Sequence, residues 1–230
     1  MPIRNLIIAA MLLLISAAAQ AESGRVIGDS IGVGVYWGAK GASNVVSTAK
    51  NSVAIYSGQI MEQLSQAKEG ETVFLSLGTN DAVGGALDVK AKVAAIVAEA
   101  NKLGVKLVWI GPPCVLKPWE KYSRELDGIL AAQLEGKATY VSTQGEEFCS
   151  PNLHAGEGVH FTMAGYTRMW QKAAAAAGFS TTAAVASAAS SSSDRVANPS
   201  HRKARRHKHK AHARRTDTRE KPETTEAQPQ

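Results

Sequence analysis

Short apolar runs alternate with helical patterns over most of the chain, and this alternation limits the fold more than any other feature. The runs expected to be strands are rich in β-branched and aromatic residues: Arg25-Val26-Ile27, Val45–Thr48, Thr72–Leu77, Val105–Ile110 and Ala138–Ser142. Strands that alternate with helices predict a parallel sheet covered by helices on both faces, which is an α/β fold.

The segments between these runs carry apolar residues at helical spacing. Two stripes consist of Val89, Val93, Ile96, Val97 and Ala100, and of Leu126, Ile129, Leu130 and Leu134. A last helix is expected from about Thr162 to Ala177, with Gly178 placed to end it. Glycine follows three of the strands, at Gly28, Gly78 and Gly111. Ligands of parallel sheets bind beyond the carboxyl ends of the strands, so we expect the chemistry in the loops that these glycines open.

A serine follows the first strand, in Gly28-Asp29-Ser30-Ile31. At a turn from strand to helix, the Ser30 hydroxyl would be exposed at the sheet edge as a nucleophile, and the backbone N–H of Ser30 could donate to an oxyanion. For this motif alone, a helix-capping serine is the simpler interpretation.

Two further positions offer hydrogen-bond donors. Asn80 follows the strongest strand in Gly78-Thr79-Asn80-Asp81, and its side-chain N–H could stabilise the negative oxygen of an acyl-transfer intermediate by about 3–4 kcal/mol. The N–H of Gly58 is another candidate. Both have ordinary alternatives, because Asn and Asp are common in turns and glycine is common before a helix.

A general base for a serine would be His154 or His160, the only histidines before residue 200. His160 stands just before the last helix, in Gly158-Val159-His160-Phe161-Thr162, where a loop can return to the sheet edge. A surface or capping histidine is the alternative.

Together these motifs resemble the SGNH hydrolases, also called the GDSL esterase/lipase family. The sequences GDSI, a following glycine, GTND and GVHFT occur in the family's order over about residues 24–178. The resemblance implies a flavodoxin-like, three-layer α/β/α sandwich with a five-stranded parallel sheet. It also implies that Ser30 is the nucleophile, that His160 is the base, and that Ser30, Gly58 and Asn80 form the oxyanion hole.

The chain departs from the family at one position. The family usually has Asp three residues before the histidine, and this chain has Glu157. A carboxylate there holds the imidazole tautomer and stabilises its charged form, which Glu157 can also do. A backbone carbonyl, or Glu146 or Glu147, are the alternatives.

The resemblance implies a serine esterase that hydrolyses carboxylic esters through a covalent acyl-enzyme and requires no metal or cofactor. Lipid, aryl and O-acetyl carbohydrate esters are all open as substrates. The loop from Gly111 to Trp119 is expected to line the pocket. Two alternatives remain: a catalytically inactive binding domain with this fold, and a polyanion-binding surface protein that acts through its basic tail.

The two ends of the chain differ from the body at about 22–179. Residues 1–21 are typical of a signal peptide, with Arg4, an apolar run from Leu6 to Ala19 and a cleavage site after Ala21. The run is short for the alternative, a membrane anchor. We therefore expect export, to the periplasm or outside the cell, and no transmembrane span.

Residues 180–230 begin as a Ser/Ala-rich linker and end in a basic tail, which is typical of disorder. Acidic and basic residues cancel over residues 1–180, so the whole net charge of +6 lies beyond them. The tail could bind an anionic polymer of the cell envelope, without nucleic-acid specificity, or only aid solubility.

The chain has two cysteines, Cys114 and Cys149. In an exported protein an even number of cysteines suggests a disulfide, and two free thiols are the alternative.

Overall fold

The computed structural model describes residues 22–181. The predicted signal peptide, residues 1–21, and the predicted tail beyond residue 181 lie outside the described residues. Within the described part of the chain, no helix is both long and apolar enough to cross a membrane.

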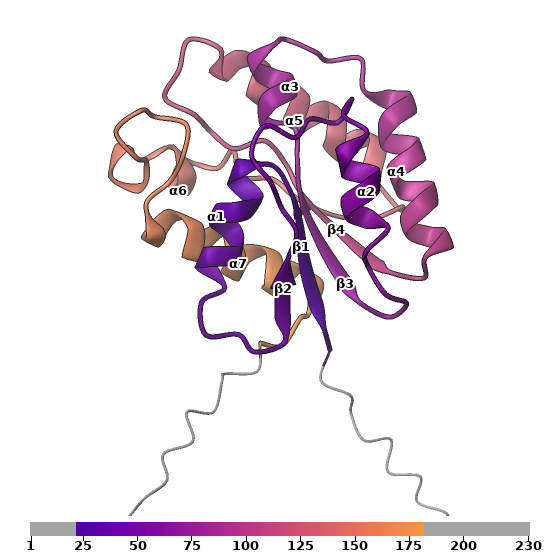
Figure 1. The fold of residues 1–230 in the computed structure, drawn as a ribbon. Coiled ribbons are helices and arrows are strands. Elements are labelled where there is room, and N and C mark those ends of the chain that lie inside the picture. The colour runs from indigo at the N-terminus through magenta and orange to yellow at the C-terminus, as the bar shows by residue number, and fades with distance from the viewer. Residues whose placement is uncertain (1–21, 182–230) are drawn as a thin grey trace, which may run out of the picture. The chain divides into compact units, whose positions relative to one another are not determined.

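Five parallel strands form one sheet, which confirms the predicted fold class (Figure 1). Their order across the sheet is β2-β1-β3-β4-β5. The strands span β1 Gly24–Gly28, β2 Val45–Ser47, β3 Thr72–Ser76, β4 Lys106–Ile110 and β5 Thr139–Val141. Each predicted strand is present, with ends within a few residues of the expected ones, because short β-branched runs buried on both faces are typical of parallel sheets.

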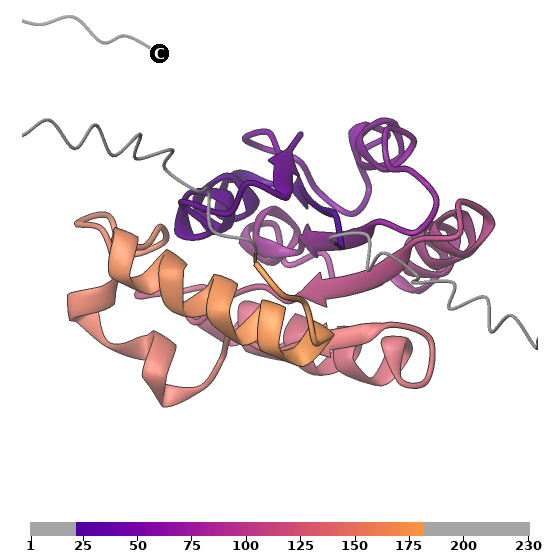
Figure 2. The ribbon, with the colours of Figure 1, turned by 90° about the horizontal axis from the view of Figure 1, so that it is seen from below.

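Helices cover both faces of this sheet, as the view along the layers shows (Figure 2). The helices are α1 Ser30–Gly38, α2 Gln59–Leu64, α3 Thr79–Val83, α4 Lys90–Lys102, α5 Glu120–Leu134, α6 Glu146–Cys149 and α7 Met163–Ala177, with a 3₁₀ turn at Pro151–Leu153. The chain is therefore the expected α/β/α sandwich.

Alternate residues of the central strands supply two separate cores. Ile27, Leu75 and Trp109 pack with α2, α4 and α5. Their neighbours Val26 and Phe74 point to the opposite face and pack with α1 and α7. This alternation follows from the two-residue period of a strand.

The last helix has the ends that the sequence predicts. The Thr162 side chain caps α7 by accepting a hydrogen bond from the Gly165 amide. Gly178 ends the helix in the left-handed region, with φ of 63°. Both predicted apolar stripes face the core, with Ile129 only partly buried.

Candidate active site

The turn from Gly28 to Ser30, here called the serine turn, links β1 to α1. Gly28 has φ of +122°, and a Cβ atom there would lie 1.8 Å from the Ser76 carbonyl oxygen, so only glycine fits. The Asp29 amide donates to the same Ser76 oxygen, at 3.1 Å. Gln63 holds the Gly28 peptide on both sides: its Oε1 accepts from the Gly28 amide at 2.6 Å, and its Nε2 donates to the Gly28 carbonyl at 3.2 Å.

Asp29 caps the helix that Ser30 begins. Its Oδ1 accepts hydrogen bonds from the amides of Ile31 at 2.9 Å and Gly32 at 3.4 Å. The side chain is fully buried, and this burial raises the pKa of Asp29 to about 7. Ser30 itself is only partly buried, so its hydroxyl is accessible beside a rigid turn.

The segment from His154 to Thr162, here called the histidine loop, returns to this edge of the sheet. It is closed mainly by its own backbone: the Ala155 amide donates to the His160 carbonyl at 2.8 Å, and the Gly158 amide donates to the Ala155 carbonyl at 2.9 Å. Gly158 allows the turn with φ of +76°. The loop therefore places Glu157 and His160 on one side of a tight turn.

The histidine loop and the serine turn meet in a chain of hydrogen bonds. His160 Nε2 lies 2.8 Å from Ser30 Oγ, and His160 Nδ1 lies 2.7 Å from Glu157 Oε1. The same Glu157 oxygen accepts from the His160 amide at 2.6 Å, and this hydrogen bond is the main reason that the pKa of Glu157 falls to about 2. These are the contacts of a nucleophile, its base and a carboxylate that orients the base.

The other acids and the other histidine lie elsewhere. Glu147 pairs with Lys172 at 2.9 Å. His154 is buried, with its Nδ1 and Nε2 each 3.0 Å from a carbonyl oxygen, those of Ser150 and Cys114. Of the carboxylates that the sequence left open, Glu157 is the one that contacts His160 within the described residues.

Two of the three candidate oxyanion donors, Ser30 and Asn80, lie in the first turns of α1 and α3, just after β1 and β3, and Gly58 lies just before α2. Asn80 Nδ2 donates one hydrogen to the Val53 carbonyl at 2.8 Å, and the second hydrogen of that amide remains for a ligand. The backbone N–H groups of Ser30 and Gly58 donate to no described residue. Gly58 is exposed and precedes α2. Each donor is thus free to receive a negative oxygen.

The loop from Gly111 to Trp119 differs in detail from the prediction. Trp119, expected in the pocket, is half-buried against the core on the α5 side. Leu116 is exposed instead, and its amide donates to the Gly158 carbonyl at 2.7 Å, so this loop supports the histidine loop. Gln63 was not among the predicted site residues, although a polar residue between Ile60 and Leu64 on a buried helix face was a signal for it.

A disulfide joins Cys114 in this loop to Cys149 in α6, with Cα atoms 5.3 Å apart. It ties the segment after β4 to the segment that leads into the histidine loop.

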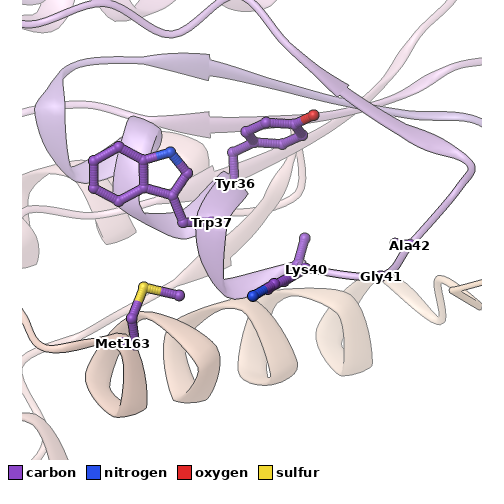
Figure 3. Close-up of a pocket in the computed structure, with 7 residues that line it drawn as sticks. Tyr36, Trp37, Lys40, Gly41, Ala42 and Met163 are labelled. Carbon is purple, nitrogen blue, oxygen red and sulfur yellow. The ribbon is translucent and has the colours of Figure 1, made fainter.

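No metal site is visible at this edge: among residues 22–181, no group of three or more His, Cys, Asp or Glu side chains could hold an ion. A hollow of about 440 Å³ lies elsewhere, between the end of α1 and the start of α7 (Figure 3). It is lined by Tyr36, Trp37, Ala39, Lys40, Gly41, Ala42 and Met163.

No protein-family model matches the sequence, and no curated protein matches it either. Solved structures do match, and they define the class of fold. The chain has the fold of the SGNH hydrolases, as the order of its motifs predicted.

Three of these structures illustrate the likeness. A protein from Slackia heliotrinireducens assigned to the SGNH hydrolases is 14% identical, with a TM-score of 0.56 over 68% of this chain and 99% of that one. A variant of Axe2, an acetylxylan esterase from Geobacillus stearothermophilus, is 15% identical, with a TM-score of 0.54 over 70% and 95%. TesA is 18% identical, with a TM-score of 0.52 over 67% and 97%.

Proposed function

We propose that this protein is an exported serine esterase of the SGNH hydrolase family. The observation that carries the proposal is the hydrogen-bonded chain from Ser30 Oγ through His160 to Glu157, at the edge of the sheet where parallel folds bind ligands. A catalytically inactive binding domain would not need this arrangement.

The proposed reaction is acyl transfer to water through a covalent intermediate. His160 Nε2 takes the Ser30 proton as Oγ attacks the ester carbonyl, while Glu157 stabilises the imidazolium. The N–H groups of Ser30, Gly58 and Asn80 stabilise the oxyanion. His160 then protonates the leaving alcohol and later activates the water that releases the acid. Apart from the ester and water, the proposed steps use groups of this chain.

Carboxylic esters are the substrate class, and we propose O-acetyl esters of polysaccharides in particular. The acetylxylan esterase Axe2 shares the fold. An exported enzyme also meets polysaccharide at the cell envelope.

The direct test is Ser30→Ala. We expect hydrolysis of a chromogenic acetate ester to fall by at least about four orders of magnitude, because the nucleophile is lost. A fluorophosphonate probe should label the wild type and not this variant. Ser65→Ala, at an exposed serine that ends α2, is the control and should keep both activity and labelling. Persistent labelling of Ser30→Ala would place the nucleophile elsewhere.

We further propose that the basic tail tethers the enzyme to an anionic envelope polymer. Residues 201–215 are almost wholly basic and include no aromatic residue. Such a segment attracts phosphates or carboxylates, and salt screens the attraction. A chain that ends at Phe179 should keep its turnover on a small ester and lose retention on anionic vesicles at low salt. Retention that does not depend on salt, or that the truncated chain keeps, would contradict the tether proposal.

A further inference from the structure

The hollow beside α1 continues into a second one, and together they form a groove. The second hollow has a volume of about 380 Å³ and shares Ala39, Lys40, Gly41 and Ala42 with the first. Its remaining lining residues are Gly38, Thr167, Trp170, Gln171 and Thr181. We call both hollows together the α1/α7 groove.

The groove begins close to the candidate active site. Trp37 stands seven residues after Ser30 in α1, which puts it on the same side of the helix, about 10 Å further along the axis. Met163, at the other wall, follows His160 by three residues. The two helices touch closely, because a Cβ atom at Gly34 would lie 2.0 Å from the Tyr166 ring. The groove therefore adjoins the segments that carry Ser30 and His160.

At the end nearest Ser30, the groove is lined by apolar side chains that are exposed. The exposed fractions are 54% for Trp37, 47% for Met163 and 38% for Tyr36, which is high for side chains of this size (Figure 3). A flat, exposed aromatic face can pack against the C–H face of a sugar ring, while the polar edge of the ring stays hydrated.

The second hollow adds polar side chains to the groove, and one charged side chain lines both hollows. Lys40 is the single charged side chain among the described residues that line it, and it makes no ion pair with any described residue. Thr167, Gln171 and Thr181 add hydrogen-bonding groups. Sugar hydroxyls and a carboxylate can bond with these groups and with Lys40, whereas an acyl chain offers them no hydrogen-bond partner.

We propose that the α1/α7 groove binds an acidic polysaccharide chain, whose acyl ester is then presented to Ser30. This inference rests on the proposed esterase function and names its substrate class. Trp37 packs on one sugar ring, and Lys40 pairs with a carboxylate further along the chain.

The test compares a polymer with a small ester, using the full chain. On O-acetylated polygalacturonate we expect Trp37→Ala to raise KM about tenfold, and Lys40→Glu to do the same. Turnover of p-nitrophenyl acetate should stay at the wild-type level in both. Trp37→Phe, which keeps an aromatic face, should recover most of the loss. Lys137→Glu, at an exposed lysine remote from the groove, is the matched charge control. All variants keep the same tail, so its attraction for the polymer cancels.

A wild-type KM for the polymer in Trp37→Ala would overturn the groove proposal. If instead the wild type hydrolyses no ester, the proposed function fails while the groove can still be examined. Calorimetry with unacetylated trigalacturonate should then show binding that Trp37→Ala weakens about tenfold. Equal binding by both proteins would overturn the proposal independently of activity.

A second inference concerns Gln63, and a different observation carries it. Gln63 is 1% exposed, among apolar neighbours of α2, and both ends of its amide bond the peptide of Gly28. A buried amide is costly without partners, so this pairing fixes how α2 sits against the serine turn.

Helix α2 carries a candidate oxyanion donor as well. Gly58 stands at its N-terminal end, five residues before Gln63. Gly58 therefore lies at one end of this short helix. Gln63, near the other end, bonds the peptide of Gly28, two positions before Ser30. We infer that Gln63 is a positioning residue that sets the Gly58 N–H relative to the Ser30 N–H. This inference also rests on the proposed function.

The test separates turnover from binding. Gln63→Leu should lower kcat at least about tenfold on p-nitrophenyl acetate with little change in KM, because the oxyanion forms only during the reaction. Gln63→Glu keeps the acceptor for the Gly28 amide and should recover part of kcat. Gln66→Leu, on the exposed side of the same segment, is the control. Should Gln63→Leu not fold, Gln63→Met makes the same test. A folded variant without the amide and with wild-type kcat would overturn the inference.

Discussion

The serine turn and the histidine loop meet at one hydrogen bond, but they are held in different ways. The serine turn is buried and is fixed by groups distant in the sequence, the Ser76 carbonyl and the Gln63 amide. The histidine loop is held largely by bonds among its own residues, and the side chains of Glu157 and His160 are 47% and 42% exposed.

The carboxyl groups of the two regions respond oppositely to their surroundings. Burial raises the pKa of Asp29 to about 7, whereas the adjacent His160 amide and ring lower the pKa of Glu157 to about 2. Ser30, the nucleophile, is therefore positioned by a buried turn that distant groups hold in place. The base is positioned by a local turn that water reaches. Substitutions in each region and the pH dependence of stability test this contrast.

Loss of the base should have the largest effect. We expect His160→Ala to lower turnover about ten-thousand-fold, because His160 is the group that contacts the Ser30 hydroxyl among the described residues. His154→Ala should leave the turnover of folded protein near the wild-type level and lower Tm, because this ring is buried between two carbonyl groups. Ester hydrolysis and thermal unfolding of both variants measure these effects. Similar losses of turnover in both would contradict the assignment of the base.

Replacing a glycine with alanine should destabilise the protein more in the serine turn than in the histidine loop. Gly28→Ala should lower the free energy of unfolding by more than about 4 kcal/mol or prevent folding, because the new Cβ meets the Ser76 carbonyl. Gly158→Ala should cost about 1–2 kcal/mol, because the new Cβ would lie 3.0 Å from Leu116 Cβ and 3.1 Å from the Leu116 carbonyl oxygen, and because the position has a positive φ. These contacts are tight but far longer than the 1.8 Å contact at Gly28. Urea unfolding measures both. Equal costs would show that the turn is no more rigid than the loop.

The stability of the two regions should depend on pH with opposite signs. Asp29 has a raised pKa in the folded state, so its contribution is complete below the unfolded value of 3.8 and is lost as pH rises towards about 7. Relative to Asp29→Asn, the wild type should therefore lose up to about 4 kcal/mol between pH 4 and 7. Glu157 has a lowered pKa, so its contribution is lost as pH falls below 4.5 towards about 2. Urea unfolding over this pH range, with Glu157→Gln as the second variant, tests both signs. If the difference in the free energy of unfolding between wild type and Asp29→Asn does not change with pH, the sign predicted for Asp29 is wrong.

Removing the charge of Glu157 should have the smallest effect on catalysis. Glu157→Gln should lower kcat about ten- to a hundredfold with little change in KM, because the amide no longer stabilises the imidazolium and the exposed site allows water to compensate in part. Glu146→Gln, at an exposed acid of α6, is the control. Steady-state kinetics on a chromogenic ester measure both. Near-full activity of Glu157→Gln would remove Glu157 from the proposed mechanism.

The sequence determined the parts of this protein that depend on local pattern. The buried strands, the capped last helix and the edge of the sheet that carries Ser30, Asn80 and His160 all follow from residue periodicity and glycine placement. Glu157 was the expected acid because it stands three residues before His160, where the resembling family usually has Asp. Glu146 and Glu147 could not be excluded in this way, since their distance from His160 depends on how α6 packs.

The groups distant in sequence that hold the candidate active site could be identified from the tertiary structure alone. Gln63 lies 35 residues from Gly28, and Leu116 lies 42 from Gly158, yet each pair shares hydrogen bonds. Trp119 was expected in the pocket, but it packs against the core. A short-range pattern specifies which face of an element is apolar. It does not specify which polar group on another element meets a given peptide, because that pairing depends on how the packed layers align.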